Sequence, residues 1–318
     1  MMLDVDALMA GGLSDWLDSQ QAVRIKAKAD GRFRTLCGVA AAGVAGFTGL
    51  IGLLPFEVAG FLAFALFCGG VVWAQMATKP VERAIKTEMN ARIAGALGLS
   101  FSIQGEPGMA FAMAREFALM LSYDDGYFED FWNGILSGVA FTLHEVRLTE
   151  ERGSGKDRRT VTVFQGVVMS AEYGRTFFGT VLIERSCGWS GLFGSDSVTR
   201  GGLELEKMRM VDPRIDDSFA LWTTDPVEGR MIVHPAYAER LLDLETRFAG
   251  QNLRALFHQG QIVIAIETGA LFESGSLDAD RDRALMDETI GQLMSLVAVA
   301  NAMNEGPRRG VNSPGSAA

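Results

Sequence analysis

The chain has 318 residues, of which 48% are hydrophobic, and its formal net charge is −10. A strongly acidic chain is a poor match to a polyanion, so nucleic acid is not an expected partner. The three cysteines supply no disulfide framework, and no phosphate-binding glycine loop with its lysine is present. The sequence therefore predicts no cofactor.

Residues 1–34 form an amphipathic arm, in which we expect Ser14 to cap a helix that runs to residue 29 and Gly31 to break it. Five bases of the arm can face anionic lipid headgroups: Arg24, Lys26, Lys28, Arg32 and Arg34. The alternative is that this helix packs on the large domain. The pattern leaves both interpretations open.

Residues 35–78 contain two uncharged apolar runs, 35–54 and 58–78, separated by a short tip that begins at Pro55. About 20 helical residues cross the hydrocarbon core of a bilayer, and backbone groups in lipid must satisfy their own hydrogen bonds. We therefore predict a transmembrane helical hairpin over residues 35–78. The other interpretation is a buried hairpin in a soluble core, which rarely contains uncharged runs of this length.

Basic residues flank the predicted hairpin on both sides, whereas its tip carries one acidic residue, Glu57. The bases of the arm precede it, and Lys79, Arg83 and Lys86 follow it. Short segments rich in Lys and Arg stay on the cytoplasmic side of a membrane. We therefore predict a two-pass protein with both termini in the cytoplasm.

The first apolar run is rich in small residues at helical spacing: Gly38, Ala42 and Gly46 form one row, and Gly49 belongs to a second. Small residues let helices approach closely in lipid. The simplest use is packing of the two spans against each other, and a second use is pairing between protomers of a homo-oligomer. Neither run carries an ionisable residue, which argues against an ion or proton pathway.

Residues 79–304 show the pattern of an α+β domain with a largely antiparallel sheet and C-terminal helices. Alternating runs predict these strands: residues 139–148, 160–170, 176–185, 203–211, 219–224, 230–233, 252–258 and 261–267. Apolar residues at helical spacing predict these helices: residues 81–97, 109–121, 235–248 and 280–304. Residues 186–202 are typical of a loop, and we expect residues 305–318 to be a disordered tail.

Several short stretches of this domain occur in the order found in a known family. They are Glu129-Asp130-Phe131 through Gly138, His144-Glu145-Val146, Val163-Phe164-Gln165-Gly166, Phe178-Gly179-Thr180, Val233-His234-Pro235-Ala236-Tyr237 with Leu241 and Leu242, Ile262-Val263-Ile264-Ala265-Ile266, and Leu271-Phe272-Glu273. With the two apolar runs, they make about residues 30–300 resemble the bacterial two-span membrane family catalogued as domain of unknown function 3137.

The resemblance implies a cytoplasmic domain that is tethered to the bacterial inner membrane and has no assigned activity. It brings no catalytic residues to carry over to this chain. Members of the family are often encoded beside a LemA-type membrane protein, so the resemblance also suggests such a protein as a partner.

Two acidic clusters are candidates for a metal site: Asp124, Asp125, Glu129 and Asp130, and Asp212, Asp216, Asp217, Asp225 and Glu228. Carboxylates can hold Mg²⁺, and in the second cluster Asp216, Asp217 and Asp225 would be the ligands. Both clusters lie in turn-rich sequence, where Asp is favoured for local hydrogen bonds. Solvated turns are therefore the alternative. The three histidines, His144, His234 and His258, show no metal-ligand spacing.

Three aromatic residues, Tyr127, Phe131 and Trp132, lie beside the first acidic cluster. They are either core residues or a surface patch that binds a partner. The missing catalytic constellation, the uncharged spans and the rows of small residues predict a membrane-anchored cytoplasmic interaction or scaffold domain that binds a protein partner or a second copy of itself. Two alternatives stay open: a metal-dependent enzyme that uses an acidic cluster, and a sensor of anionic lipid that uses the basic arm.

Overall fold

The structure is a computed structural model that describes residues 5–136, 138–173, 177–186, 196–210, 213–233, 235–247 and 251–304. The predicted disordered tail at residues 305–318 lies outside the described residues, and so do Asp212 and His234. The chain divides into two units. We call them the helical unit (Met1–Ala96 with Glu273–Ile290) and the sheet unit (Leu97–Phe272 with Gly291–Ala318).

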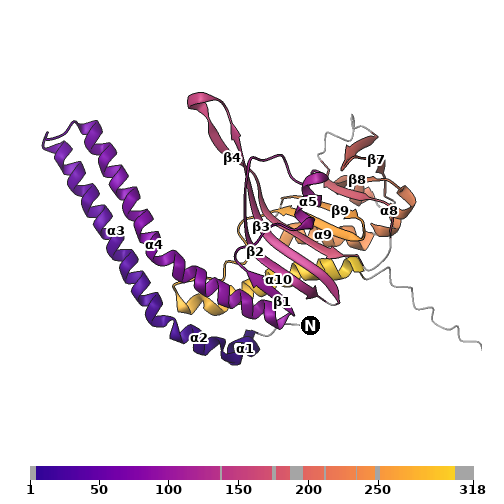
Figure 1. Cartoon of the computed structure of the whole chain (residues 1–318), viewed down its shortest axis with the longest axis horizontal. Helices are drawn as coiled ribbons and strands as arrows, with labels where there is room; N and C mark the ends of the chain where they lie inside the picture. The colour runs from indigo at the N-terminus through magenta and orange to yellow at the C-terminus, as the bar shows by residue number, and fades with distance from the viewer. Residues whose placement is uncertain are drawn as a thin grey trace, which may run out of the picture. The chain divides into compact units, whose positions relative to one another are not determined.

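The helical unit is built around two long antiparallel helices, α3 (Gln21–Leu50) and α4 (Phe56–Ala96), which lie side by side (Figure 1). Within the described residues, three short helices precede them: α1 (Val5–Leu8), the π-helix η1 (Met9–Leu13) and α2 (Ser14–Ser19). The 3-10 turn η3 (Ala279–Arg281) and the first part of α10 (Asp282–Asn304) complete the unit. Two long apolar helices therefore precede the sheet, as the sequence predicts.

The helix of the arm differs from its prediction at both ends. Ser14 does not cap it, because Ser14 lies within a helical stretch and its Oγ donates to the carbonyl oxygen of Met9 at 3.0 Å. Gly31 does not break it, because α3 continues through this residue. A Cβ at Gly31 would lie 2.9 Å from Cγ2 of Thr78. This glycine therefore allows α4 to approach α3 instead of ending a helix.

Helix α4 joins two elements that the sequence predicts as separate, the second apolar run and the helix at 81–97. Pro80 lies inside α4. Proline has no backbone N–H to donate, but the loss of this one hydrogen bond does not end the helix here. Ile85, Met89 and Ile93 recur at the four-residue spacing that predicts a helix over residues 81–97, and all three are fully buried.

Within the described residues, the sheet unit contains one ten-stranded sheet in the order β1-β2-β3-β4-β10-β9-β5-β8-β7-β6. The strands are β1 (Leu99–Ser102), β2 (Asp125–Leu136), β3 (Val139–Arg152), β4 (Arg159–Glu172), β5 (Val181–Arg185), β6 (Ser197–Arg200), β7 (Leu203–Met208), β8 (Phe219–Thr223), β9 (Gln251–His258) and β10 (Gln261–Glu267). Every neighbouring pair is antiparallel. The predicted α+β class with a largely antiparallel sheet is therefore confirmed.

The helices of the sheet unit are short, apart from α9 and the shared helix α10. Among the described residues they are α5 (Met109–Glu116), the 3-10 turn η2 (Gly155–Asp157), α7 (Pro213–Ser218), α8 (Pro226–Ile232) and α9 (Pro235–Arg247). The predicted strand at 230–233 is wrong, because these residues lie in and just after α8. The side chain of Asp225 caps this helix by accepting from the backbone N–H of Val227 and Glu228.

The sequence pattern predicts none of β1, β2 and β6. Strand β2 has a bulge between Glu129 and Trp132, where Asp130 has a φ of 55°. A bulge interrupts the alternation by which a strand is recognised. Strand β6 falls inside the segment predicted as a loop at residues 186–202.

The two faces of the sheet are covered by different helices. Helix α5 packs on the face that carries Val146, Val168 and Leu256 in one apolar core. Successive residues of a strand point to opposite faces, so Phe257 lies on the other side. There its ring meets that of Tyr237 of α9 at a centroid distance of 5.4 Å. Figure 1 shows α5 and α9 among the strands of this unit.

Candidate functional site

The sheet unit contains a cavity of about 420 Å³ between the N-terminal part of α5 and strands β2, β3 and β4. Its polar lining residues include Asn133, Thr142, His144 and Ser170, and its apolar ones include Phe131 and Met113. We call this space the His144 cavity. The described residues that line it include one carboxylate, Glu106, and no lysine or arginine.

The strand register brings the polar groups of the cavity together. Asn133 of β2 faces Thr142 of β3, which in turn faces Ser170 of β4. Residues directly opposite each other in an antiparallel pair project from the same face. Oγ1 of Thr142 and Oγ of Ser170 are 2.8 Å apart and share a hydrogen bond. His144 lies two positions after Thr142, so it projects from this face as well.

His144 is the ionisable group at the base of the cavity. It is 3% exposed, and its Nε2 has no hydrogen-bond partner among the described residues. Burial lowers the pKa of His144 from 6.5 to about 4, so the ring is neutral at neutral pH. The ring stacks on Phe131 at a centroid distance of 5.2 Å. A neutral imidazole can donate or accept a hydrogen bond, according to its tautomer.

The segment before α5 forms the rim of the cavity. A Cβ at Gly105 would lie 2.9 Å from the ring of Phe131, so a glycine is needed where this segment crosses the ring. Met109 also lines the cavity and is 78% exposed. A polar base with an exposed methionine at its rim can accept a polar group that carries an apolar neighbour.

The predicted aromatic patch is divided between the two faces of β2. Phe131 is buried against His144, whereas Trp132 is fully buried against Phe101 and Phe272. Tyr127 is half exposed. These three residues therefore do not form one surface. The sequence signal that could have found the cavity is the pair Thr142 and His144 at alternate positions of one strand, with Ser170 near the end of the next strand.

The carboxylates proposed as metal ligands interact with the backbone. Asp216 accepts from the N–H of Met210 at 3.0 Å, and Asp225 caps α8. In the first cluster, Asp124 accepts from the N–H of Glu151 at 2.8 Å. Among the described residues, no three His, Cys, Asp or Glu side chains lie close enough together to hold a metal ion. The structure does not bring Asp216, Asp217 and Asp225 together as a ligand set.

The small residues of α3 occupy different positions in the helical unit. A Cβ at Gly38 would lie 2.6 Å from Cα of Gly70, and one at Gly49 would lie 2.6 Å from Cβ of Ala59. A Cβ at Gly46 would have no neighbour within 4 Å, and Ala42 is half buried. Gly38 and Gly49 therefore lie between α3 and α4, whereas Gly46 does not.

The bases of the arm also divide into two groups. Arg24 is 1% exposed, and its Nη1 lies 2.8 Å from Oδ2 of Asp282, so it does not face a lipid surface. The guanidinium of Arg34 lies 5.2 Å from the ring centroid of Trp73. Lys26 and Arg32 are exposed, and Lys28 is partly exposed.

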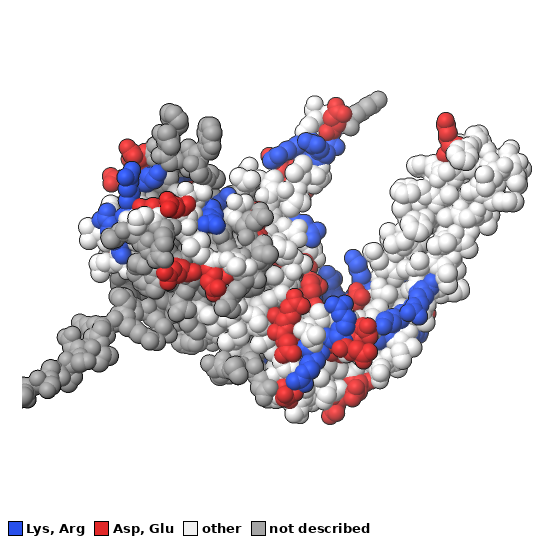
Figure 2. Space-filling view, turned by 180° about the vertical axis from the view of Figure 1, so that it is seen from behind, with Lys and Arg blue, Asp and Glu red and all other residues white. Residues whose placement is uncertain are grey.

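The outer surface of the α3 and α4 pair is apolar. Both helices are long and apolar enough to cross a membrane, and only 11% of the most apolar window of each is buried. Large side chains such as Val44, Phe61 and Phe64 are about two-thirds exposed or more. Figure 2 shows an uncharged surface along the pair, between an acidic side chain at its tip and the basic and acidic side chains gathered at its other end.

The fold and these features first define the class of the protein: a sheet-rich α+β unit preceded by two helices that could span a membrane. The model of the family described as "Protein of unknown function (DUF3137)" matches residues 162–305. The match confirms, over that range, the resemblance seen in the sequence. It does not extend to the two apolar helices.

A crystal structure of the mycobacterial trehalose monomycolate transport factor A, TtfA, is similar with a TM-score of 0.36 and 10% identity. The similarity covers 70% of this chain and 98% of that chain. At these values the likeness supports no conclusion about fold or function. No curated protein matches the sequence.

Proposed function

We propose that the protein is a membrane-anchored interaction protein, in which α3 and α4 cross the bilayer and the sheet unit binds a partner on the cytoplasmic side. The His144 cavity would hold an uncharged polar group of that partner. A LemA-type membrane protein, suggested by the family resemblance, and a second copy of this chain are the first partners to examine.

The outward apolar surface of α3 and α4 is the observation that carries the anchor. In water, large exposed side chains along the apolar parts of two helices would favour aggregation, because soluble proteins rarely expose apolar patches of this extent. In a bilayer the same side chains would contact the apolar acyl chains of the lipid. The small residues Gly38, Gly49 and Gly70 lie between the helices, as expected for helices that pack in a membrane.

The unpartnered Nε2 of His144 supports the binding role of the cavity. Buried polar atoms nearly always have a partner, and one without a partner costs about 1–3 kcal/mol. A ligand group that donates or accepts at Nε2 would remove this cost. Because no lysine or arginine lines the described part of the cavity, an uncharged group suits it better than an anion.

Fractionation of cells that express the full chain tests the anchor. The protein should remain in the membrane pellet after an alkaline carbonate wash, and detergent should release it. Release by carbonate alone would contradict the proposal.

Protease accessibility tests the orientation. Protease added to intact spheroplasts should leave the sheet unit uncut, and the same protease should cut it after lysis. Cleavage before lysis would contradict the cytoplasmic orientation.

Site-directed crosslinking tests the binding role. A photoreactive phenylalanine analogue replaces Met109 at the rim of the cavity, or Met231 as a control, which is 69% exposed and does not line the cavity. Irradiated membranes should give a crosslinked product from position 109 only. The product should disappear in the His144→Phe background, which keeps a ring on Phe131 and removes both nitrogens. Equal products from both positions, or a product unaffected by His144→Phe, would contradict the proposal.

A further inference from the structure

A second hollow lies within the helical unit, as a groove of about 660 Å³ between α3, α4 and Leu277. The residues that α3 contributes are Lys28, Gly31, Arg32, Thr35 and Leu36. Those that α4 contributes are Val71, Ala74, Gln75 and Thr78. The spacings of three, four and seven residues place each set along one side of its helix. The groove is therefore bordered by two facing helix rows.

The groove is polar at one end and apolar at the other. The helices are antiparallel, since Gly31 approaches Thr78 and Gly38 approaches Gly70. Lys28 and Arg32 consequently lie at the end of the groove near Thr78, and Leu36 lies at the end near Val71. From Leu36 towards the tip of the hairpin, both helices carry no charged residue apart from Glu57. The apolar end therefore leads directly onto the surface that we propose to lie in lipid.

The two bases of the groove are available to an anion. Arg32 is exposed and has no ion-pair partner in the part of the chain that the structure describes. Nζ of Lys28 lies 3.8 Å from Oδ1 of Asp278, and these side chains are 41% and 52% exposed. An exposed pair at this distance holds the lysine weakly. By contrast, Arg24 forms a buried ion pair with Asp282 and is not available to an anion in the groove.

We propose that this groove binds the phosphate of an anionic phospholipid, with Lys28 and Arg32 on the phosphate and an acyl chain along Leu36 and Val71. Basic pockets between membrane helices on the cytoplasmic side are suited to such headgroups. The side-chain amide of Gln75 can donate a hydrogen bond to a headgroup oxygen, whereas the hydroxyls of Thr35 and Thr78 donate to the backbone carbonyls of Gly31 and Gln75. Free phosphate would use the basic end alone, so the apolar end favours a lipid. The inference rests on the proposed insertion of α3 and α4 in a bilayer.

Lipid retention by the purified full chain tests the groove. The protein is extracted in mild detergent, supplied with phosphatidylglycerol or phosphatidylcholine, and examined by native mass spectrometry. Phosphatidylglycerol should stay bound at concentrations where phosphatidylcholine does not. Lys28→Gln with Arg32→Gln should weaken its retention by about 100-fold, because each charge-assisted hydrogen bond to the phosphate contributes about a 10-fold gain in binding. Excess glycerol phosphate should not displace the lipid.

Two matched variants separate this site from general attraction to anionic lipid. Lys26→Gln with Lys79→Gln removes the same charge from exposed positions outside the groove and should retain the lipid. Val71→Trp fills the apolar end without a change of charge and should release the lipid. Val72→Trp changes the neighbouring residue, which is 53% exposed and does not line the groove, and should retain it.

Three results would overturn the inference. They are equal retention of both lipids, equal losses in the groove variants and their controls, and displacement by glycerol phosphate, which would identify a free phosphate site. Failure of the anchor is a separate outcome, because a chain that carbonate releases from the membrane needs no detergent for its purification. A chain that does need detergent, but retains no phosphatidylglycerol, contradicts the groove alone.

Discussion

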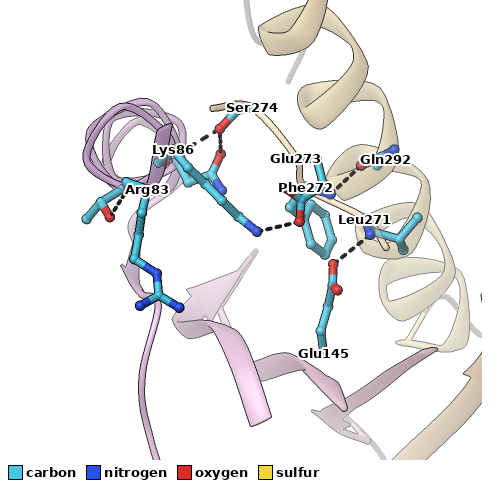
Figure 3. Close-up of polar contacts among 10 residues, drawn as sticks. Arg83, Lys86, Glu145, Leu271, Phe272, Glu273, Ser274 and Gln292 are labelled. Atoms are coloured by element: carbon cyan, nitrogen blue, oxygen red, sulfur yellow. Dashed lines mark hydrogen bonds and ion pairs between the residues drawn. The ribbon is translucent and has the colours of Figure 1, made fainter. Parts of the chain in front are cut away.

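Arg24 of α3 and Asp282 of α10 form a buried ion pair, with Nη1 2.8 Å from Oδ2, although 258 positions separate them in the chain. Their side chains are 2% and 7% exposed. A second contact of the same segment involves Nζ of Lys86 and Oε1 of Glu273, 2.8 Å apart (Figure 3). Within the helical unit, the segment Glu273–Ile290 is thus held on both α3 and α4.

Asp282→Asn should destabilise the helical unit by about 3–5 kcal/mol, because it leaves the guanidinium of Arg24 buried without its counter-charge. Hydrogen exchange of the full chain in detergent would show this as faster exchange of the first turns of α10. Arg24→Met combined with Asp282→Leu should restore much of the protection, since an apolar pair can replace a buried ion pair. Asp6→Asn breaks the exposed pair of Asp6 with Arg283 and should change little. Equal effects of the two asparagine variants would contradict the role assigned to burial.

The sequence predicts the two long helices and most of the sheet, because length and apolar period are local properties of the chain. It does not predict which base of the arm is buried. Arg24 is an interior residue that pairs with Asp282, and a partner 258 positions away leaves no signal in the sequence around Arg24. Gly31 is misread for the same reason, since its role depends on Thr78 of the other helix.

The His144 cavity depends on strand register, which sequence alone does not provide. Asn133, Thr142 and Ser170 become neighbours only when β2, β3 and β4 pair in the observed register. Phe131 and Trp132 are adjacent in the sequence and suggest one aromatic patch, but in strand β2 their side chains project from opposite faces of the sheet. The local signal in β2 is further obscured by the bulge at Asp130.

Acid should destabilise the sheet unit through His144. The pKa of this residue falls from 6.5 to about 4 on folding, because burial disfavours the charged ring. As the pH falls, the unfolded chain therefore binds a proton at this position before the folded chain does. The contribution of His144 to stability is present above pH 6.5 and is lost as the pH falls towards 4. The full loss is about 3 kcal/mol. Hydrogen exchange of β3 amides, corrected for the intrinsic rate at each pH, would measure it.

His144→Phe should remove this pH dependence and leave stability at neutral pH equal or higher. The variant replaces a buried nitrogen that has no partner among the described residues with an apolar ring of similar shape. An unchanged pH profile in this variant would mean that another group causes the acid sensitivity.

Gly38→Leu and Gly46→Leu should separate packing within the hairpin from pairing between copies. A side chain at Gly38 meets the backbone of Gly70, whereas one at Gly46 meets nothing within 4 Å. In detergent, Gly38→Leu should therefore lower the unfolding temperature, and Gly46→Leu should leave it unchanged. If copies associate through the side of α3 that carries Gly46, sedimentation should show that only Gly46→Leu shifts a folded oligomer towards monomer. A lower unfolding temperature for Gly46→Leu would contradict the assigned packing.

Gly275→Ala and Gly291→Ala should change stability in opposite directions, although each adds one methyl group. A Cβ at Gly275 would clash with the carbonyl oxygen of Glu82 and meet Cβ of Lys86 at 3.0 Å, so the segment that carries Glu273 and Ser274 must move away from α4. Forced overpacking of this kind costs about 1–3 kcal/mol.

Gly291 lies inside α10, where a Cβ would meet nothing within 4 Å. Alanine there should stabilise the helix by about 0.5–1 kcal/mol, because glycine loses more backbone entropy on folding. Thermal unfolding of the full chain in detergent would compare the two variants. A Gly275→Ala protein as stable as the original chain would mean that this segment does not depend on close contact with α4. Movement of the segment away from α4 would also break the 2.7 Å hydrogen bond that Oγ of Ser274 donates to Oδ1 of Asn90.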